Sequence, residues 1–132
     1  MPEVLFEELK KIEGKRILIA DDSTDTREFL KRALEVFGCE VEVATDGASA
    51  IDLATKDKFD AVILDFRMPV MDGHAASREL RSSGFSGPIV GITAEPELIE
   101  TIDDDTLFDA FLFKPVNRVQ LASVVGAQLA KC

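Results

Sequence analysis

Residues 60–73 have the sequence DAVILDFRMPVMDG and form the central segment of the predicted fold. Four consecutive apolar residues, 61–64, predict a short strand that is buried on both faces. Asp65 ends the run. Because an unpaired carboxylate is costly inside a dry strand, we expect it at the carboxyl tip, where open parallel sheets place their ligand crevice. Pro69 cannot continue the strand, and Asp72 is a suitable N-cap for a following helix. We therefore expect Asp65 to be an exposed, chemically available carboxylate on a rigid platform.

The length and composition indicate one globular domain. The chain has 132 residues, of which 46% are apolar and 30% are charged, a balance typical of domains with a single hydrophobic core. It contains no apolar run near the ~20 residues that a membrane helix needs. Its first residues carry neither a basic flank nor a signal-peptide core. We therefore expect a cytoplasmic location and no membrane partner.

The net charge and the cysteines narrow the class of partner. A formal net charge of −10 argues against direct contact with nucleic acid, because such binding depends on lysine and arginine. The charge favours metal cations or basic protein surfaces as partners. Cys39 and Cys132 are isolated in the sequence and lack the spacing of a metal site, and we expect no disulfide between them in a reducing compartment.

Five apolar runs alternate with five helical patterns along the chain. We expect strands at residues 16–20, 40–44, 61–64, 89–92 and 109–113, and helices at about 24–37, 47–57, 72–82, 96–104 and from 117 onward. Such units imply a parallel sheet with right-handed crossovers. The predicted fold class is α/β, a single flavodoxin-like (βα)5 domain with sheet order 2-1-3-4-5 and helices on both faces. We assign residues 15–132 to this domain and residues 1–14 to an N-terminal helical arm.

Polar residues follow the apolar runs at the predicted strand ends. Asp21 and Asp22 follow the first run, Asp65 the third, Thr93 the fourth and Lys114 the fifth. The carboxyl ends of parallel strands lie on one edge of the sheet, and neighbouring strands are ~4.8 Å apart. We therefore expect three carboxylates, a hydroxyl and an ammonium group to share one crevice.

This combination of groups favours phosphoryl chemistry. Three neighbouring carboxylates repel one another, and a hard divalent cation such as Mg²⁺, which prefers oxygen ligands, relieves that repulsion. A carboxylate can act as a nucleophile and become an aspartyl-phosphate. Mg²⁺ and Lys114 would neutralise charge on the phosphoryl oxygens, and Thr93 would donate a hydrogen bond to them. The residues therefore predict a site that accepts and holds a phosphoryl group on Asp65.

At these positions the chain resembles the receiver domain of two-component response regulators. The resemblance covers residues 15 to about 131 and depends on Asp21-Asp22 and on the segments 65–73 (DFRMPVMDG), 88–94 (PIVGITA) and 111–115 (FLFKP). It implies a phosphoacceptor that takes a phosphoryl group onto Asp65 from the phosphohistidine of a histidine kinase or a phosphotransfer protein. It implies no enzymatic turnover beyond self-catalysed phosphoryl transfer and autodephosphorylation.

The resemblance also implies roles for the residues around the acceptor. The side chains of Asp22 and Asp65 and the backbone carbonyl of Arg67 would ligate Mg²⁺, and Asp21 would act mostly through a bound water. Lys114 would pair with the phosphoryl oxygens.

A second set of implied roles concerns switching. Thr93 and Phe111 would be the switch pair: the threonine would move toward the phosphoryl group and the phenylalanine ring would turn inward. The output face would be formed by the helix after residue 96, the strand at 109–113 and the last helix. Arg67 and Glu95 would modulate access of water to the phosphoryl group, and we expect an ion pair between them across the mouth of the site.

One departure from the family pattern lies just before the fifth strand. The family often has a small Ala-Gly pair there, whereas this chain has Thr106-Leu107-Phe108. Leu107 and Phe108 either enlarge an apolar output surface or pack inward.

The sequence leaves the setting of the module open. It fits a free-standing signalling protein that binds a downstream protein partner or passes the phosphoryl group on in a relay. A close variant is the receiver part of a hybrid histidine kinase. We expect a monomer or a weak, phosphorylation-dependent dimer.

Two other classes of function compete with this interpretation. A small phosphohydrolase with an aspartyl nucleophile, similar to the haloacid dehalogenase group, would need a second aspartate two residues after Asp65, where this chain has Arg67. A flavin carrier of similar fold would need a Ser/Thr/Gly-rich loop after the first strand, where this chain has Asp21-Asp22-Ser23.

Overall fold

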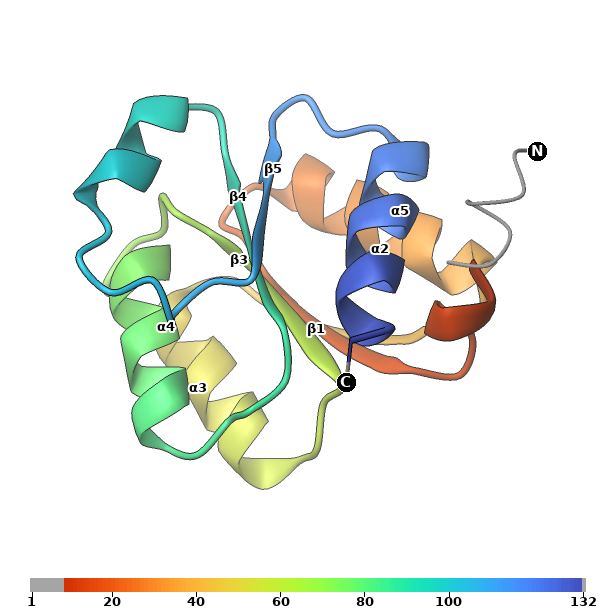
Figure 1. Ribbon diagram of the computed structural model, residues 1–132, viewed down its shortest axis with the longest axis horizontal. Helices are drawn as coiled ribbons and strands as arrows, with labels where there is room; N and C mark the ends of the chain where they lie inside the picture. The colour runs from red at the N-terminus through yellow and green to blue at the C-terminus, as the bar shows by residue number, and fades with distance from the viewer. Residues whose placement is uncertain (1–8, 132) are drawn as a thin grey trace.

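The centre of the molecule is a parallel five-stranded sheet. The computed structural model describes residues 9–131, and residues 1–8 and Cys132 lie outside the described part. The strand order is β2-β1-β3-β4-β5 (Figure 1). The strands are β1 (Arg16–Ala20), β2 (Glu40–Ala44), β3 (Ala61–Asp65), β4 (Ile89–Thr93) and β5 (Ala110–Phe113). All four neighbouring pairs are parallel, so the predicted flavodoxin-like α/β fold is confirmed.

Helices cover both faces of the sheet and begin at side-chain caps. The α-helices are α2 (Thr24–Val36), α3 (Gly47–Lys56), α4 (Gly73–Ser82) and α5 (Arg118–Leu129). Each has an N-cap whose side-chain oxygen accepts the backbone N–H three residues further on; these caps are Ser23, Asp46, Asp72 and Asn117. Such caps satisfy N–H groups that the first helical turn leaves unpaired. The predicted cap at Asp72, which starts the helix after the central strand, is therefore confirmed.

The core consists of two clusters, one on each side of the sheet. Because successive strand residues face opposite sides, Ile19 and Ile63 pack with Leu30 of α2 and Leu121 of α5. Their neighbours Leu18, Val62 and Leu64 pack on the other side with Ala50 of α3 and Leu80 of α4. In Figure 1, α3 and α4 accordingly lie apart from α2 and α5. Strands β1 and β3 are buried on both faces, which holds their carboxyl ends in fixed positions.

A helix is present where one was predicted at residues 96–104, but it is of the 3₁₀ type and ends three residues earlier. A six-residue 3₁₀ helix, η1 (Pro96–Thr101), stands in its place, with no side-chain cap and no buried residue. The run Asp103-Asp104-Asp105 would put three negative charges at the negative end of a longer helix, which disfavours its continuation. The open question at Leu107 and Phe108 is settled toward inward packing, because their exposed fractions are 2% and 8%.

The predicted N-terminal arm lies partly outside the described residues. Residues 9–12 are helical. Ile12 is fully buried in the same cluster as Ile17. The division into residues 1–14 and 15–132 stays a prediction. No helix within residues 9–131 has the length and hydropathy that a bilayer span requires.

Candidate functional site

Three of the predicted polar residues come together at the carboxyl edge of the sheet. Asp21 follows β1, Asp65 ends β3 and Lys114 follows β5. The Nζ atom of Lys114 lies 3.0 Å from Oδ2 of Asp65 and 3.2 Å from Oδ2 of Asp21. Residues that are 49 positions apart in the chain are thus joined by a direct hydrogen bond, from Lys114 to Asp65.

Asp65 is buried, and the prediction of an exposed carboxylate is wrong. Its exposed fraction is 2%. Its Oδ1 accepts the backbone N–H of Arg67 at 3.1 Å, and its Oδ2 accepts Lys114. Gly73, at the start of α4, packs directly against the backbone carbonyl of Asp65. The loop after β3 and the lysine therefore cover a carboxylate that a bare strand end would expose.

Burial changes the acidity of Asp65. Desolvation raises its pKa from 3.8 to about 6, against the opposing effect of the hydrogen bonds from Arg67 and Lys114. The nearby negative charge of Asp21 contributes to this rise in the pKa. The carboxylate is thus poised to ionise just below neutral pH, where an added cation would favour its charged form.

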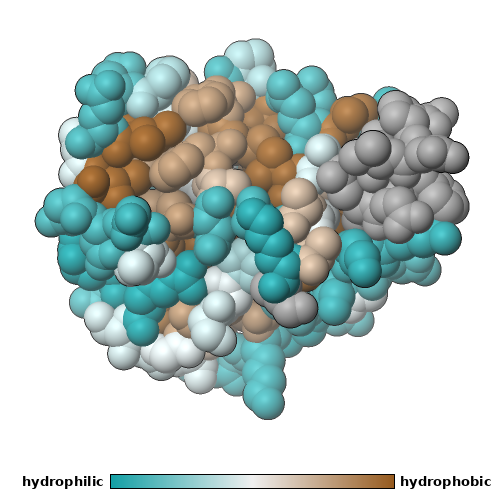
Figure 2. Space-filling model, in the orientation of Figure 1, coloured by the Kyte–Doolittle hydropathy of each residue, from teal (hydrophilic) through white to brown (hydrophobic). Residues whose placement is uncertain are grey.

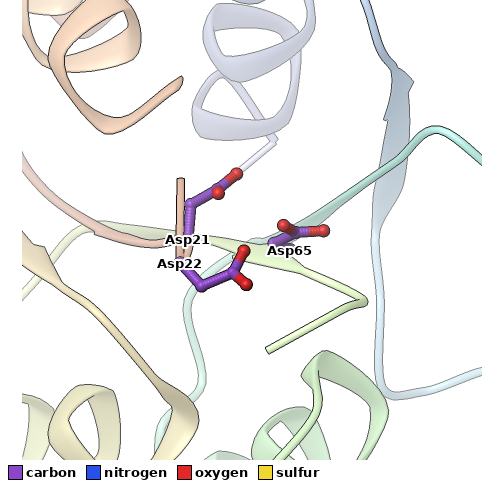
Figure 3. Close-up of side chains that lie close together, drawn as sticks. All are labelled: Asp21, Asp22 and Asp65. Carbon is purple, nitrogen blue, oxygen red and sulfur yellow. The ribbon is translucent and has the colours of Figure 1, made fainter. Parts of the chain in front are cut away.

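Asp21, Asp22 and Asp65 form a compact group of carboxylates that could serve as metal ligands (Figure 3). Each offers a carboxylate oxygen, and these oxygens all lie within 4.8 Å of one another. Asp21 is fully buried and its Oδ1 accepts the backbone N–H of Ser23 at 2.8 Å, whereas Asp22 is exposed.

One oxygen in this group lacks a hydrogen-bond donor. Within residues 9–131, no donor hydrogen-bonds to Oδ2 of Asp21, because Lys114 approaches it outside hydrogen-bond geometry. A buried oxygen that is ion-paired with Lys114 but accepts no hydrogen bond within the described part of the chain, beside two further carboxylates, fits a hard cation that takes oxygen ligands. The residues present are therefore suited to Mg²⁺.

Lys114 keeps its charge in this setting. Burial alone would lower the pKa of Lys114, but the hydrogen bond with Asp65 and the charges of Asp65 and Asp21 outweigh it, so that the pKa is raised. The ammonium group is therefore available to neutralise anionic oxygens at Asp65.

Thr93 lies at the same edge but bonds elsewhere. It ends β4 and is 1% exposed. Its hydroxyl accepts the backbone N–H of Glu95 at 2.9 Å and donates to the carbonyl of the same residue at 3.3 Å. In this arrangement the hydroxyl of Thr93 stabilises the loop after β4.

An ion pair spans two loops beside the acidic group. The guanidinium of Arg67 contacts the carboxylate of Glu95 through two hydrogen bonds, of 3.1 and 2.6 Å, as the sequence led us to expect. The hydrogen bond from Arg67 lowers the pKa of Glu95, and the pKa of Arg67 is raised in turn. Both side chains are more than one third exposed.

An aromatic cluster next to Asp65 was not predicted from the sequence. The rings of Phe66, Phe108 and Phe111 lie with centroids 5.1–6.0 Å apart. The available signals were an aromatic residue directly after the acidic one and a large residue where the family often has a small one. Neither signal specifies a contact between residues more than 40 positions apart.

Comparison with known proteins identifies relatives of the whole domain. Residues 17–126 match the family described as the response regulator receiver domain. The chain is 40% identical over 117 residues to the response regulator MprA of Mycolicibacterium vanbaalenii and 38% identical to that of Mycobacterium avium. In both cases the match covers 88% of this chain and 51% of the relative. The chain therefore spans about half the length of the curated relatives it matches.

Solved structures share the fold over most of the chain. The chemotaxis response regulator CheY4 of Vibrio cholerae has a TM-score of 0.79 at 31% identity, covering 86% of this chain and 98% of that one. The receiver domain of a Pseudomonas aeruginosa sensor histidine kinase has a TM-score of 0.82 at 28% identity and covers 89% of this chain and 98% of that one. That structure is described as having a magnesium ion coordinated in its active site cleft.

Proposed function

Since the chain belongs to the response regulator receiver domain family of two-component systems, we propose that it is a phosphoacceptor whose acceptor atom is a carboxylate oxygen of Asp65. One observation carries the proposal: the buried carboxylate of Asp65 lies 3.0 Å from the ammonium of Lys114, in a group of three aspartates. Membership of a regulatory family favours this function over the phosphohydrolase alternative.

The transfer needs little more than positioning and neutralisation of charge. A carboxylate oxygen of Asp65 attacks the phosphorus of a phosphohistidine, and the P–N bond breaks. The imidazole nitrogen keeps the bonding electron pair and takes up a proton. Lys114 lies close enough to Asp65 to pair with the oxygens of the incoming phosphoryl group.

We also propose that the three aspartates form a binding site for Mg²⁺. Asp22 and Asp65, with the backbone carbonyl of Arg67, would hold Mg²⁺, and Asp21 would contribute mostly through a bound water. When bound, the cation supplies positive charge that neutralises the carboxylates and the phosphoryl oxygens. Two observations support this assignment: the buried Oδ2 of Asp21 accepts no hydrogen bond from the described residues, and the carboxylate oxygens of the three aspartates all lie within 4.8 Å of one another.

The switching part of the proposal concerns Thr93 and Phe111. A phosphoryl group adds roughly −1.5 to −2 charges and several acceptor oxygens. A charge-assisted hydrogen bond worth ~1.5–3 kcal/mol would draw the Thr93 hydroxyl from Glu95 toward that group, and the Phe111 ring would turn inward. A free energy of this size shifts a two-state equilibrium without making it complete.

The surface that responds would be η1, β5 and α5. Figure 2 shows apolar side chains gathered over η1 and β5 on this face. Leu98, Ile99 and Phe111 are half-buried there, and Phe113 is 47% exposed. We propose that a protein partner binds this face, and that the donor is a histidine kinase or phosphotransfer protein.

The test is phosphorylation by a small donor. The protein is incubated with acetyl phosphate and Mg²⁺, and its intact mass is measured. We expect one added phosphoryl group on the wild type and none on Asp65→Asn. Asp52→Asn is the matched control, because Asp52 is an exposed carboxylate paired with Lys56 on α3. Phosphorylation of Asp65→Asn to the wild-type level would refute the assignment.

A further inference from the structure

The aromatic cluster connects the acceptor strand to β5. Phe66 directly follows Asp65, Phe108 precedes β5 and Phe111 lies within it. The ring centroid of Phe108 lies 5.1 Å from that of Phe66 and 5.4 Å from that of Phe111, and both distances are typical of direct aromatic contact. Phe108 therefore sits against both other rings.

The three rings pack against Gly91 and leave no room for a side chain there. Gly91 of β4 is paired in register with Phe111. A Cβ atom at this glycine would meet ring atoms of Phe66 and Phe111 at 3.0 Å and of Phe108 at 3.1 Å. Three rings thus fill the space above one glycine, so a Phe111 ring that turned further toward this glycine would have to displace another ring.

The backbone on both sides of Phe108 is held in place. The carbonyl of Leu107 accepts a hydrogen bond from Arg81 at 3.2 Å. The carboxylate of Asp109 accepts Arg81 and the backbone N–H of Ile89, both at 2.9 Å. These contacts join α4 and β4 to the segment that carries Phe108, so that its ring has little freedom to leave the cluster.

We propose that Phe108 is a positioning residue that holds Phe111 in its half-exposed, resting place and sets the resting bias of the switch. The proposal rests on the assigned roles of Thr93 and Phe111 and adds the element that opposes them. Inward movement of Phe111 requires Phe108 to shift within a segment fixed by Arg81. The chain therefore favours the resting state more strongly than one with a small side chain at position 108.

The experiment observes the ring at position 111 directly. 4-Fluorophenylalanine replaces Phe111 alone, and its ¹⁹F signal and solvent isotope shift in H₂O and D₂O report the exposure of the ring. The isotope shift is measured for the otherwise unchanged chain, for Phe108→Ala and for Phe108→Leu, in the absence of any phosphodonor.

We expect the isotope shift to fall toward that of a buried ring in Phe108→Ala and to take an intermediate value in Phe108→Leu. Phe59→Ala is the control, because Phe59 belongs to the same core cluster but its ring contact is with Arg16. An unchanged isotope shift in both position-108 variants, or an equal fall in Phe59→Ala, overturns the proposal. Phe108→Leu leaves a smaller cavity than Phe108→Ala, so it is compared with the wild type if the alanine variant does not fold.

The outcome is separable from the phosphoacceptor function. The ring is observed without phosphate, and intact mass after addition of acetyl phosphate and Mg²⁺ is recorded on the same samples. A failed mass shift with a moved ring would refute the assignment of Asp65 alone. A normal mass shift with an unmoved ring would refute the role of Phe108 alone.

Discussion

Arg67 and Glu95 form a two-point ion pair, with Nε–Oε1 and Nη2–Oε2 distances of 3.1 and 2.6 Å. Arg67 also donates its backbone N–H to the carboxylate of Asp65. Glu95 bonds through its backbone to the hydroxyl of Thr93. One ion pair thus connects the loop that contacts the proposed acceptor with the loop that holds the proposed switch residue.

Arg67→Ala is expected to shorten the lifetime of the phosphoryl group. Loss of the guanidinium removes the bridge between the loops and gives water easier access to the phosphorus, so we expect decay to accelerate by up to about tenfold. The lifetime is measured by intact mass after removal of acetyl phosphate.

One further variant and one control test whether the ion pair is responsible. Glu95→Gln should have an effect in the same direction, because it removes the charge of the same pair. Lys31→Ala, which breaks an ion pair on α2 with Glu35, should leave decay unchanged. Equal decay rates in Arg67→Ala and the wild type would exclude a screening role.

Asp65→Asn is expected to stabilise the metal-free protein at neutral pH. The pKa of Asp65 is raised to about 6 in the fold from its ordinary value of 3.8, so the folded state binds more protons between these pH values. The contribution of Asp65 to the free energy of unfolding is therefore greatest below pH 3.8 and falls as the pH rises from 3.8 to about 6. A neutral asparagine avoids the cost of a buried charge, so we expect a gain of about 1–3 kcal/mol at pH 7.

The measurement is urea unfolding in EDTA at several pH values. The gain should shrink as the pH is lowered toward 4, where the wild-type carboxyl group is protonated. Asp52→Asn should show no such dependence. A constant difference between Asp65→Asn and the wild type from pH 4 to pH 7 would contradict the raised pKa.

The positions of the strand ends were predictable because the chemistry changes abruptly there. Uninterrupted apolar runs stop at Asp21, Asp65 and Lys114, and a parallel sheet leaves only one edge on which these ends can meet. The α/β class followed from the alternation of strand and helix periods. Right-handed crossovers left only a few strand orders, and 2-1-3-4-5 was the flavodoxin-like one among them.

The burial of Asp65 could not be read in the same way. It depends on how the loop of residues 66–72 folds back, on the close approach of Gly73 and on the reach of Lys114. The contact between Phe66 and Phe108 likewise depends on tertiary packing, because no local pattern relates two rings so far apart in sequence. The helix expected at 96–104 is shorter in the structure, because the missing side-chain cap and the acidic residues after it, rather than apolar spacing, limit the length of η1.

Asp22→Asn is expected to weaken Mg²⁺ binding. A cation that binds only the folded protein raises its free energy of unfolding, by about 2.7 kcal/mol at about 100 times the dissociation constant. We therefore expect Mg²⁺ to raise the melting temperature of the wild type, and EDTA to reverse the change. Asp22→Asn should lose most of this increase, and Asp52→Asn should keep it. An increase of the same size in all three proteins would place the cation elsewhere.

Gly91→Ala is expected to destabilise the protein through the three rings above it. The added Cβ would lie 3.0–3.1 Å from Phe66, Phe108 and Phe111, each of which is confined by the other two. Overpacking of this kind costs about 1–3 kcal/mol. If the rings are the cause, the cost must be smaller in a Phe108→Ala background, because the space left by the missing ring can take up the methyl group. Urea unfolding of the wild type, the two single variants and the double variant measures this coupling. Strict additivity would mean that the β4 backbone, rather than the ring cluster, resists a side chain at position 91, and that the rings are free to separate.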